Sequence, residues 1–397
     1  MTLTKLGGVC NFVRGPFGGA LKKDCFVQSG FAVYEQQHAI YRQFSTIRYY
    51  IDKEKFEELK RFELRAGDLI MSCSGTMGKV AKVPKGIEKG IINQALLKLT
   101  PSENINLDFL TYWMESKSFQ DQLSGNTHGA AIKNIASVKI LKDLEIPLPP
   151  LPEQQKIAAI LDAADKLKQK DQQLIEKYNT LSQSLFLDMF GDPKLNPKKW
   201  KLSYLHEVIE DGPQNGLYKP SKDYGSGAPI IRIDSFHNSI VETKSLKRVN
   251  INETELSNFE IFENDFVINR VNSPSHLGKC GLVPKINERM VYESNMMRVK
   301  FNTKKTNIVF MLSILSSQYL KNQILNSSKD AVNQSSINQK DVNNFTIPLP
   351  PINLQNQFAE RIQAIESQKQ QAQASLQKSE DLFNSLLQRA FKGELTA

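Results

Sequence analysis

Cysteine, histidine and tryptophan are scarce in this chain, whose 397 residues include four, five and two of them, respectively. None of the cysteines forms a CxxC pair and the histidines have no metal-ligand spacing, so a zinc site is not expected. Buried thiols in a reducing compartment are the simpler interpretation. The sequence also has no apolar run as long as a membrane span and no N-terminal signal-peptide pattern. We therefore expect a cytoplasmic protein with no membrane partner.

An excess of acidic residues is also missing. The chain has 51 Lys and Arg against 42 Asp and Glu, a net charge of +9, which favours a polyanionic partner. Residues 151–190 have five lysines and six acidic residues, and residues 352–397 have five residues of each sign. The positive excess therefore belongs to the remainder. That distribution favours phosphate binding by the remainder over the alternative, in which scattered lysines only solvate its surface.

Two copies of one long unit make up the chain. The segment EIPLPPLPEQQKIAAILDAADKL (145–167) is followed by TIPLPPINLQNQFAERIQAIESQ (346–368) at a shift of 201 residues. Upstream, GKVAKVP (78–84) matches GKCGLVP (278–284) at a shift of 200. Because the shift is almost constant over a long stretch, the pattern indicates a duplicated unit with small loop insertions.

Each copy has a globular part, here called the head, and a helical part, called the rod. The heads contain short strand-like runs such as DLIMS and DFVIN, followed by a short helical segment. The rods have apolar residues at steps of three and four, which is typical of a heptad stripe. PLPP can neither continue a strand ladder nor lie inside a helix, so we interpret it as a stiff joint that sets the angle between head and rod.

The sequence predicts an α+β protein in which two mixed α/β heads are joined by two long antiparallel helices that form a coiled coil, a pseudo-twofold tandem repeat. Head 1 is expected at 1–150, rod 1 at 151–192, head 2 at 193–351 and rod 2 at 352–397. The helical pattern from Ile157 to Phe190 covers 34 residues, which makes a helix about 50 Å long. The residues expected to pack in the coiled coil are Ile157, Leu161, Ala164, Leu174, Leu181, Leu185, Phe358, Ile362, Ile365, Leu376, Leu382 and Leu386.

The whole chain resembles the specificity subunit of a bacterial type I restriction–modification system. The most specific residues are the repeated IPLPP and the LPEQQKIAAILDAADKL that follows its first copy (151–167). GDLIMSCSGTMGKVA (67–81) and NDFVINRVNSPSHLGK (264–279) support the resemblance. The second copy departs from the first at Asn353 and Leu354, where the first has proline and glutamate.

The resemblance implies that each head is a target-recognition domain that binds one half of a split DNA site, with the rods setting the spacing. It also implies two adenine-N6 methyltransferase subunits docked along the rods, and motor–nuclease (restriction) subunits that join for cleavage. S-adenosylmethionine, ATP and magnesium would belong to those partners. This chain would then be a non-catalytic subunit with no cofactor of its own.

Loops rich in Gly, Ser, Asn, Lys and Arg are the candidates for contacts with double-stranded DNA, because cations neutralise phosphates and polar side chains reach bases. SGTMGK (74–79) is not a P-loop, since Cys73 and Val80 break that pattern. A turn that brings Lys79 to a phosphate and a plain turn between strands are equal alternatives. Arg270 would bind guanine bidentately or form a surface ion pair. The candidates are Arg14, Lys22, Lys23, Ser74, Thr76, Lys79, His128, Lys133, Lys219, Arg232, Arg270, Asn272, Ser273, Ser275, Lys279, Asn333 and Gln334.

Two other classes of function, an enzyme and a scaffold protein, are alternatives to a DNA specificity subunit. An adenine methyltransferase would resemble chains with an N/D-P-P-Y/F/W tetrapeptide and a Gly-rich cofactor loop, and neither is in the sequence. A nuclease would use clustered carboxylates with a lysine, but DKEKFEELK (52–60) is typical of a solvated helix face. A coiled-coil scaffold without a DNA role is the second alternative, and it predicts weak, salt-insensitive contact with duplex DNA.

Overall fold

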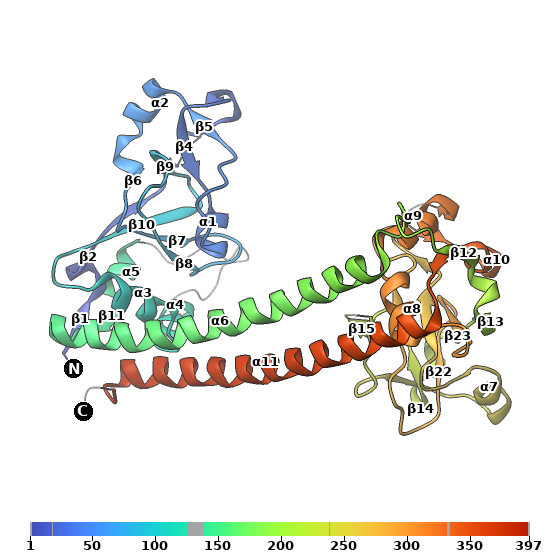
Figure 1. Ribbon diagram of the computed structural model, residues 1–397. Coiled ribbons are helices and arrows are strands. Elements are labelled where there is room, and N and C mark those ends of the chain that lie inside the picture. The colour runs from blue at the N-terminus through green and yellow to red at the C-terminus, as the bar shows by residue number, and fades with distance from the viewer. Residues whose placement is uncertain (1, 18, 126–137, 238, 332–333, 396–397) are drawn as a thin grey trace. The chain divides into compact units, whose positions relative to one another are not determined.

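The computed structural model describes residues 2–17, 19–125, 138–237, 239–331 and 334–395 (Figure 1). The chain divides into two compact units. Unit 1 consists of residues 1–173 and 372–397, and unit 2 of residues 174–371. Each unit contains one head and parts of both long helices, α6 (Leu151–Phe190) and α11 (Ile352–Lys392).

Head 1 is built on two sheets and a strand pair. Its strands follow the orders β2-β10-β7-β8, β3-β5-β4-β9-β6 and β1-β11. The strands are β1 (Leu3–Lys5), β2 (Cys10–Arg14), β3 (Phe26–Val27), β4 (Phe31–Tyr34), β5 (Tyr50–Ile51), β6 (Glu63–Leu64), β7 (Leu69–Ser72), β8 (Val80–Lys82), β9 (Gly90–Ile92), β10 (Leu96–Pro101) and β11 (Glu145–Pro147). The helices are α1 (Gln36–Tyr41), α2 (Lys53–Glu58), α3 (Leu107–Glu115), α4 (Lys117–Gly125) and α5 (Val138–Asp143).

Head 2 repeats this plan with a larger first sheet and one additional three-stranded sheet. Its strand orders are β13-β23-β19-β21-β16-β15, β17-β14-β22-β18, β20-β25-β24 and β12-β26. The strands are β12 (Lys201–Tyr204), β13 (Ile209–Asn215), β14 (Tyr224–Ile231), β15 (Phe236–His237), β16 (Ile240–Val241), β17 (Lys247–Val249), β18 (Glu260–Ile261), β19 (Phe266–Asn269), β20 (Val271–Asn272), β21 (Cys280–Leu282), β22 (Met290–Tyr292), β23 (Met296–Phe301), β24 (Lys329–Ala331), β25 (Gln334–Ser336) and β26 (Thr346–Leu349). The helices are α7 (Glu253–Asn258), α8 (Ile308–Leu315), α9 (Gln318–Ser327) and α10 (Gln339–Asn344).

The duplication is visible in strand register. In unit 1, Leu99 of β10 lies opposite Leu69 of β7, and in unit 2, Val299 of β23 lies opposite Phe266 of β19. All four residues of β7 and of β19 are buried, and three of the four in each strand are apolar. In unit 1, α3 and α4 lie between the four-stranded sheet and α6 (Figure 1). The core there includes the fully buried Trp113 of α3.

The long helices pack against each other inside unit 1, where the start of α6 meets the end of α11. The Asp171 carboxylate accepts hydrogen bonds from Ser375 Oγ (3.1 Å) and Ser379 Oγ (2.9 Å). Closer to the start of α6, Lys168 Nζ lies 4.4 Å from the centre of the Phe383 ring. Residue numbers fall along α6 as they rise along α11, so the helices are antiparallel. The predicted α+β class, with two mixed heads and two long antiparallel helices, is confirmed.

Burial along the rods differs from the predicted stripe at three positions. The side chains of Leu174, Leu181 and Leu382 are 40%, 49% and 46% exposed. The side of α6 that is less exposed to solvent includes polar residues such as Lys168 and Asp171. The predicted stripe considered apolar residues alone, so at these three positions it selects residues that lie beside the buried side of the helix. Of the other predicted packing residues, Ile157, Leu161, Ala164 and Phe358 are buried, and Leu185, Ile362, Ile365, Leu376 and Leu386 are half-buried.

The serine–aspartate contact in this seam gives a stability prediction. Ser379→Ala is expected to lower the free energy of unfolding by about 1–3 kcal/mol, because it leaves a buried carboxylate with one partner fewer. Ser379 and Asp171 are 3% and 8% exposed. Urea unfolding followed by circular dichroism measures the change. Ser385→Ala, on the exposed side of the same helix, is the control, and equal losses in the two variants would contradict the prediction.

Candidate nucleic-acid interface

One end of the first sheet in each unit carries several of the predicted contact residues, and we call it the loop edge. In unit 1 it is formed where β2 ends at Arg14, β10 begins, and the β7–β8 connection leaves at Cys73. Gly15 donates to Leu96 O at 3.0 Å. A Cβ atom on Gly15 would lie 1.8 Å from Asn93 O, so only glycine allows this close approach.

The loop edge of unit 2 is built in the same way. Gly216 donates to Met296 O at 3.0 Å, and a Cβ atom there would lie 2.3 Å from Glu293 O. Arg270 follows β19 and donates its backbone N–H to Asn295 O at 2.8 Å. Unit 1 has the matching bond from Cys73 to Ala95 O at 2.9 Å. Arg270 therefore occupies the place that Cys73 has in unit 1.

The loop edges carry the candidate arginines Arg14 and Arg270, which come from different strands. In unit 1, Arg14 lies at the end of β2, and its guanidinium lies 5.5 Å from the Phe17 ring. Burial raises the pKa of the Cys73 thiol to about 11, and the nearby positive charge of Arg14 opposes that rise. In unit 2, Arg270 starts from the position equivalent to Cys73. Nε of both arginines is buried with no hydrogen-bond partner among the residues that the structure describes.

The remaining candidates of head 1 are only partly brought together. Ser72 Oγ donates to Thr76 O at 2.6 Å and closes a tight turn that carries Ser74, Thr76 and Lys79 at the loop edge. Gly75 and Gly78 have φ of +62° and +72°, which favours glycine in this turn. Lys22 and Lys23 are exposed and lie at the start of a short 3-10 turn before β3, a strand of the other sheet. His128 and Lys133 lie outside the described residues.

Head 2 gathers more of its candidates. Arg270 Nη1 donates to Ser294 O at 3.0 Å, and Asn272 of β20 pairs with Ser335 of β25, next to Gln334. The hydroxyls of Ser273 and Ser275 lie 3.1 and 2.8 Å from His276 Nδ1. This turn therefore presents a row of hydroxyl and amide groups beside a guanidinium, the groups that bind bases and phosphates.

The other basic candidates of head 2 already have protein partners. Lys279 Nζ donates to Phe236 O at 2.7 Å. Arg232 Nε lies 3.7 Å from Glu293 Oε2, next to Ser294, and Lys219 Nζ lies 2.7 Å from Glu255 Oε1. Burial raises the pKa of Glu293, against the lowering effects of the Ile233 backbone N–H and of Arg232. Asn333 lies outside the described residues.

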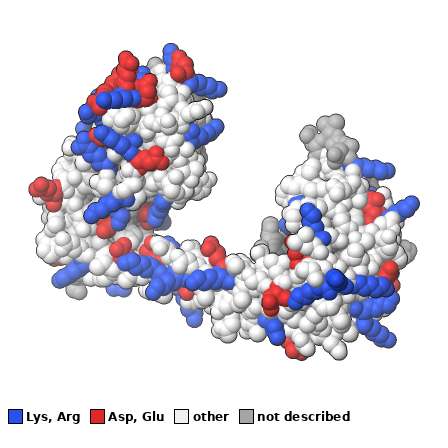
Figure 2. Space-filling model, turned by 45° about the horizontal axis from the view of Figure 1, so that its top comes forward, with Lys and Arg blue, Asp and Glu red and all other residues white. Residues whose placement is uncertain are grey.

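One basic residue of this edge was not among the sequence candidates. Lys321 Nζ donates to Ser275 O at 2.7 Å and so adds a positive charge to the turn. It lies on α9, within an ordinary helical pattern, and no sequence signal distinguishes it from a surface lysine. Figure 2 shows basic side chains spread over both heads in this view, interspersed with acidic ones.

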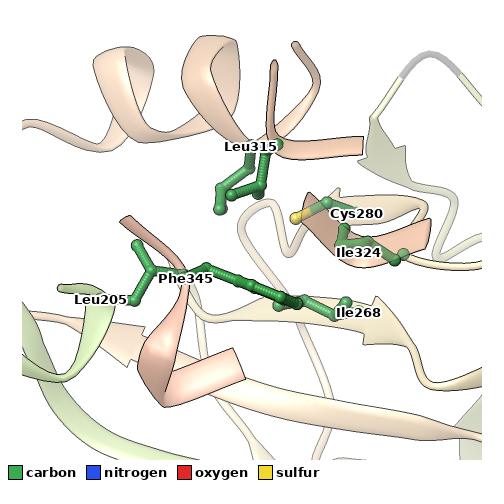
Figure 3. A pocket seen from close by; sticks show the side chains of 8 residues that line it. Leu205, Ile268, Cys280, Leu315, Ile324 and Phe345 are labelled. Atoms are coloured by element: carbon green, nitrogen blue, oxygen red, sulfur yellow. The ribbon is translucent and has the colours of Figure 1, made fainter. Parts of the chain in front are cut away.

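A small apolar cavity in unit 2 offers no polar chemistry (Figure 3). It is lined by Leu205, Ile268, Gly278, Cys280, Leu315, Leu320, Ile324 and Phe345. A Cβ atom on Gly278 would lie 2.3 Å from Ile324 Cδ1, so this wall of the cavity requires glycine. Within the described ranges, no group of three or more His, Cys, Asp or Glu residues is placed to hold a metal ion. No helix in those ranges is long and apolar enough to cross a membrane.

Comparison with known proteins identifies one family model over most of the chain and relatives over about three quarters of it. A family model described as type I restriction modification DNA specificity domain matches residues 1–177 and 197–378. The EcoKI specificity subunit of Escherichia coli K12 is 27% identical over 319 residues, which are 75% of this chain and 68% of that protein. The MjaVIII specificity subunit of Methanocaldococcus jannaschii is also 27% identical, over 70% of this chain and 68% of its own length.

Solved structures show the same fold. A type I restriction–modification S subunit from M. genitalium has a TM-score of 0.55 at 16% identity, covering 98% of this chain and 96% of its own. A chain from a study of complex assembly and conformational transition of the type I restriction–modification system has a TM-score of 0.61 at 18% identity. That match covers 99% of this chain and 98% of the other. At these identities the likeness concerns the fold alone.

Proposed function

The chain belongs to the family of type I restriction–modification DNA specificity domains, and on that premise we propose that its two heads bind the two halves of a split DNA site. Head 1 (1–150) binds one half and head 2 (193–351) binds the other. Rod 1 (151–192) and rod 2 (352–397) set the distance between the halves. The chain itself is the specificity subunit and carries no catalysis.

The observation that carries this proposal is the duplicated loop edge. Each unit places one arginine, Arg14 or Arg270, beside a turn rich in serine, glycine and lysine. Two equivalent edges in one chain fit two half-sites, each contacted in the major groove by guanidinium, hydroxyl and amide groups. The candidate residues named from the sequence are proposed contacts of these edges. The coiled-coil scaffold offers no reason for a duplicated basic edge.

The rods are proposed to bind the methyltransferase subunits. Ile160, Leu167, Leu174 and Leu181 lie every seventh residue along α6 and are 38%, 45%, 40% and 49% exposed. Apolar residues at heptad spacing fit a helix of a partner protein. We infer two methyltransferase subunits and, for cleavage, restriction subunits. These partners would supply S-adenosylmethionine, ATP and magnesium. We place the assembly in the cytoplasm, with the DNA that it binds.

Methylation mapping tests the proposal. The chain would be co-expressed with the methyltransferase subunit of its own operon, and methylated adenines would be mapped across the host genome. We expect one split motif with two fixed halves and an unspecified gap. Exchanging residues 1–150 for those of a relative with another specificity should change one half only. A stable complex without sequence-specific methylation would contradict the proposal and favour the scaffold.

A further inference from the structure

A buried glutamine joins the head to the rod in unit 1. Gln154 lies in the first turn of α6 and is 1% exposed. Its Nε2 donates to Pro149 O at 2.8 Å and to Asn104 O at 3.2 Å. Its Oε1 accepts from the backbone N–H of Asn106 at 2.8 Å. Asn106 is the N-cap residue of α3, so one side chain connects the proline joint, the rod and a core helix of the head.

Unit 2 contains the same arrangement at the equivalent position. Gln355 lies in the first turn of α11 and is 0% exposed. Its Nε2 donates to Pro350 O at 2.7 Å. Its Oε1 accepts from the backbone N–H of Asn307 at 2.8 Å and from Thr306 Oγ1 at 3.0 Å. Asn307 is the N-cap residue of α8. The two joints therefore give the same geometry twice, with different neighbouring sequences.

Glutamine suits this place because it donates and accepts at once. A buried carbonyl needs a donor, and neighbouring prolines in PLPP supply no N–H group. The amide Nε2 provides that donor while Oε1 satisfies a backbone N–H of the head. Methionine would match the length but satisfy neither, and glutamate would remove the donor and add a buried charge.

We propose that Gln154 and Gln355 are positioning residues that hold each head at a fixed angle on its rod, so that the two half-sites are bound at a single spacing. The inference rests on the proposed function, because a fixed angle matters only if two heads contact one DNA. Each base pair added to the gap moves a half-site by about 3.4 Å along the helix axis. A head free to tilt on its rod therefore tolerates gaps that a rigid one rejects.

The test uses the full chain with its methyltransferase partner. Gln154→Met and Gln355→Met would be compared with the unchanged chain on plasmids that carry both half-sites with gaps from two base pairs shorter to two longer. Methylation at the native gap relative to its neighbours is the measured quantity. We expect that ratio to fall about tenfold in each variant, since small displacements of bound groups have effects of this order or more.

Matched controls separate positioning from stability. Gln122 and Gln323 form two-ended hydrogen bonds to the backbone of Glu145 and Thr346, at 3.0 and 2.9 Å, inside their own heads. Gln122→Met and Gln323→Met should reduce methylation equally at all gaps, leaving the ratio unchanged. Joint variants that behave like these controls would overturn the inference.

Three further outcomes are distinguishable. If the methionine variants fail to accumulate, Gln154→Glu and Gln355→Glu, which keep the acceptor, are measured in the same way, and an unchanged ratio in them overturns the inference. If the unchanged chain methylates no split site, the proposed function fails. If it selects one gap and the joint variants select it equally well, only the positioning role fails.

Discussion

Arg298→Met is expected to lower the free energy of unfolding of unit 2 by about 3–5 kcal/mol, because it leaves the buried carboxylate of Asp265 without its counter-ion. Arg298 lies on β23 and is 7% exposed, and Asp265 is 0% exposed. Arg298 Nη1 lies 3.3 Å from Asp265 Oδ2. Its other Nη contacts the carboxylate of Asp211 and Gln214 Oε1. The double variant Asp265→Asn, Arg298→Met should recover most of the loss.

The loss should also depend on pH in a defined direction. Burial raises the pKa of Asp265, and both the Phe262 N–H and Arg298 oppose the rise. Without Arg298 the pKa rises further. A carboxyl whose pKa is raised by folding binds more protons when folded, so stability falls as pH rises from about 3.9 through the folded pKa. Urea unfolding should therefore show a larger deficit at pH 8 than at pH 5.

Unit 1 supplies the matched control for this prediction. Lys98 occupies the equivalent position on β10, but its Nζ donates to the backbone O of Glu63 at 2.6 Å. The equivalent carboxylate, Asp68, accepts from Thr100 Oγ1 at 2.6 Å and from the Arg65 N–H at 2.9 Å. Lys98→Met should therefore cost less and vary little with pH. Equal, pH-independent losses in both variants would contradict the ion-pair argument.

The repeat predicted the architecture well because duplication constrains many residues together. A shift of 197–201 residues relates the sheets, the short helices and both long helices, and no single loop or side chain decides it. The heptad stripe was less successful in detail. The seam near Asp171 is polar, and its hydrogen bonds to Ser375 and Ser379 come from a segment more than two hundred residues away.

The proline joint contains a feature that sequence analysis alone did not identify. PLPP predicted a stiff connection, but the residues that connect it to the head are the glutamines that follow. Gln154 and Gln355 recur at the same shift of 201. A glutamine in a helical first turn looks like an exposed polar residue, and only the three-dimensional contacts with Asn106 and Asn307 show its burial. Side-chain burial against a distant segment is not encoded in local pattern.

The two loop-edge arginines are a similar case. Arg14 and Arg270 were selected separately as basic residues in loops. Aligning the repeats places Cys73, not an arginine, opposite Arg270. The equivalence appears only when β2 and the end of β7 are seen to meet at one edge, because the guanidinium reaches it from a different strand in each unit.

Arg14→Ala is therefore expected to relax one half of the methylated motif, and Arg270→Ala the other half. An arginine that binds a base bidentately contributes about 1–3 kcal/mol of discrimination, so the preference for that base should fall by roughly 10–100-fold. Adenine-methylation mapping with each variant, in complex with the methyltransferase, measures base preference at every position of both halves. Lysine substitutions should relax the same position, since lysine keeps the charge but loses the planar fork.

The pattern of loss distinguishes base recognition from phosphate binding. A guanidinium that binds only phosphate would weaken methylation at all sites alike and make it more sensitive to salt, without changing the motif. Arg65→Ala and Arg248→Ala remove one exposed charge from each head and serve as controls that should leave both halves intact. A motif unchanged in both alanine variants would contradict base recognition by these two arginines.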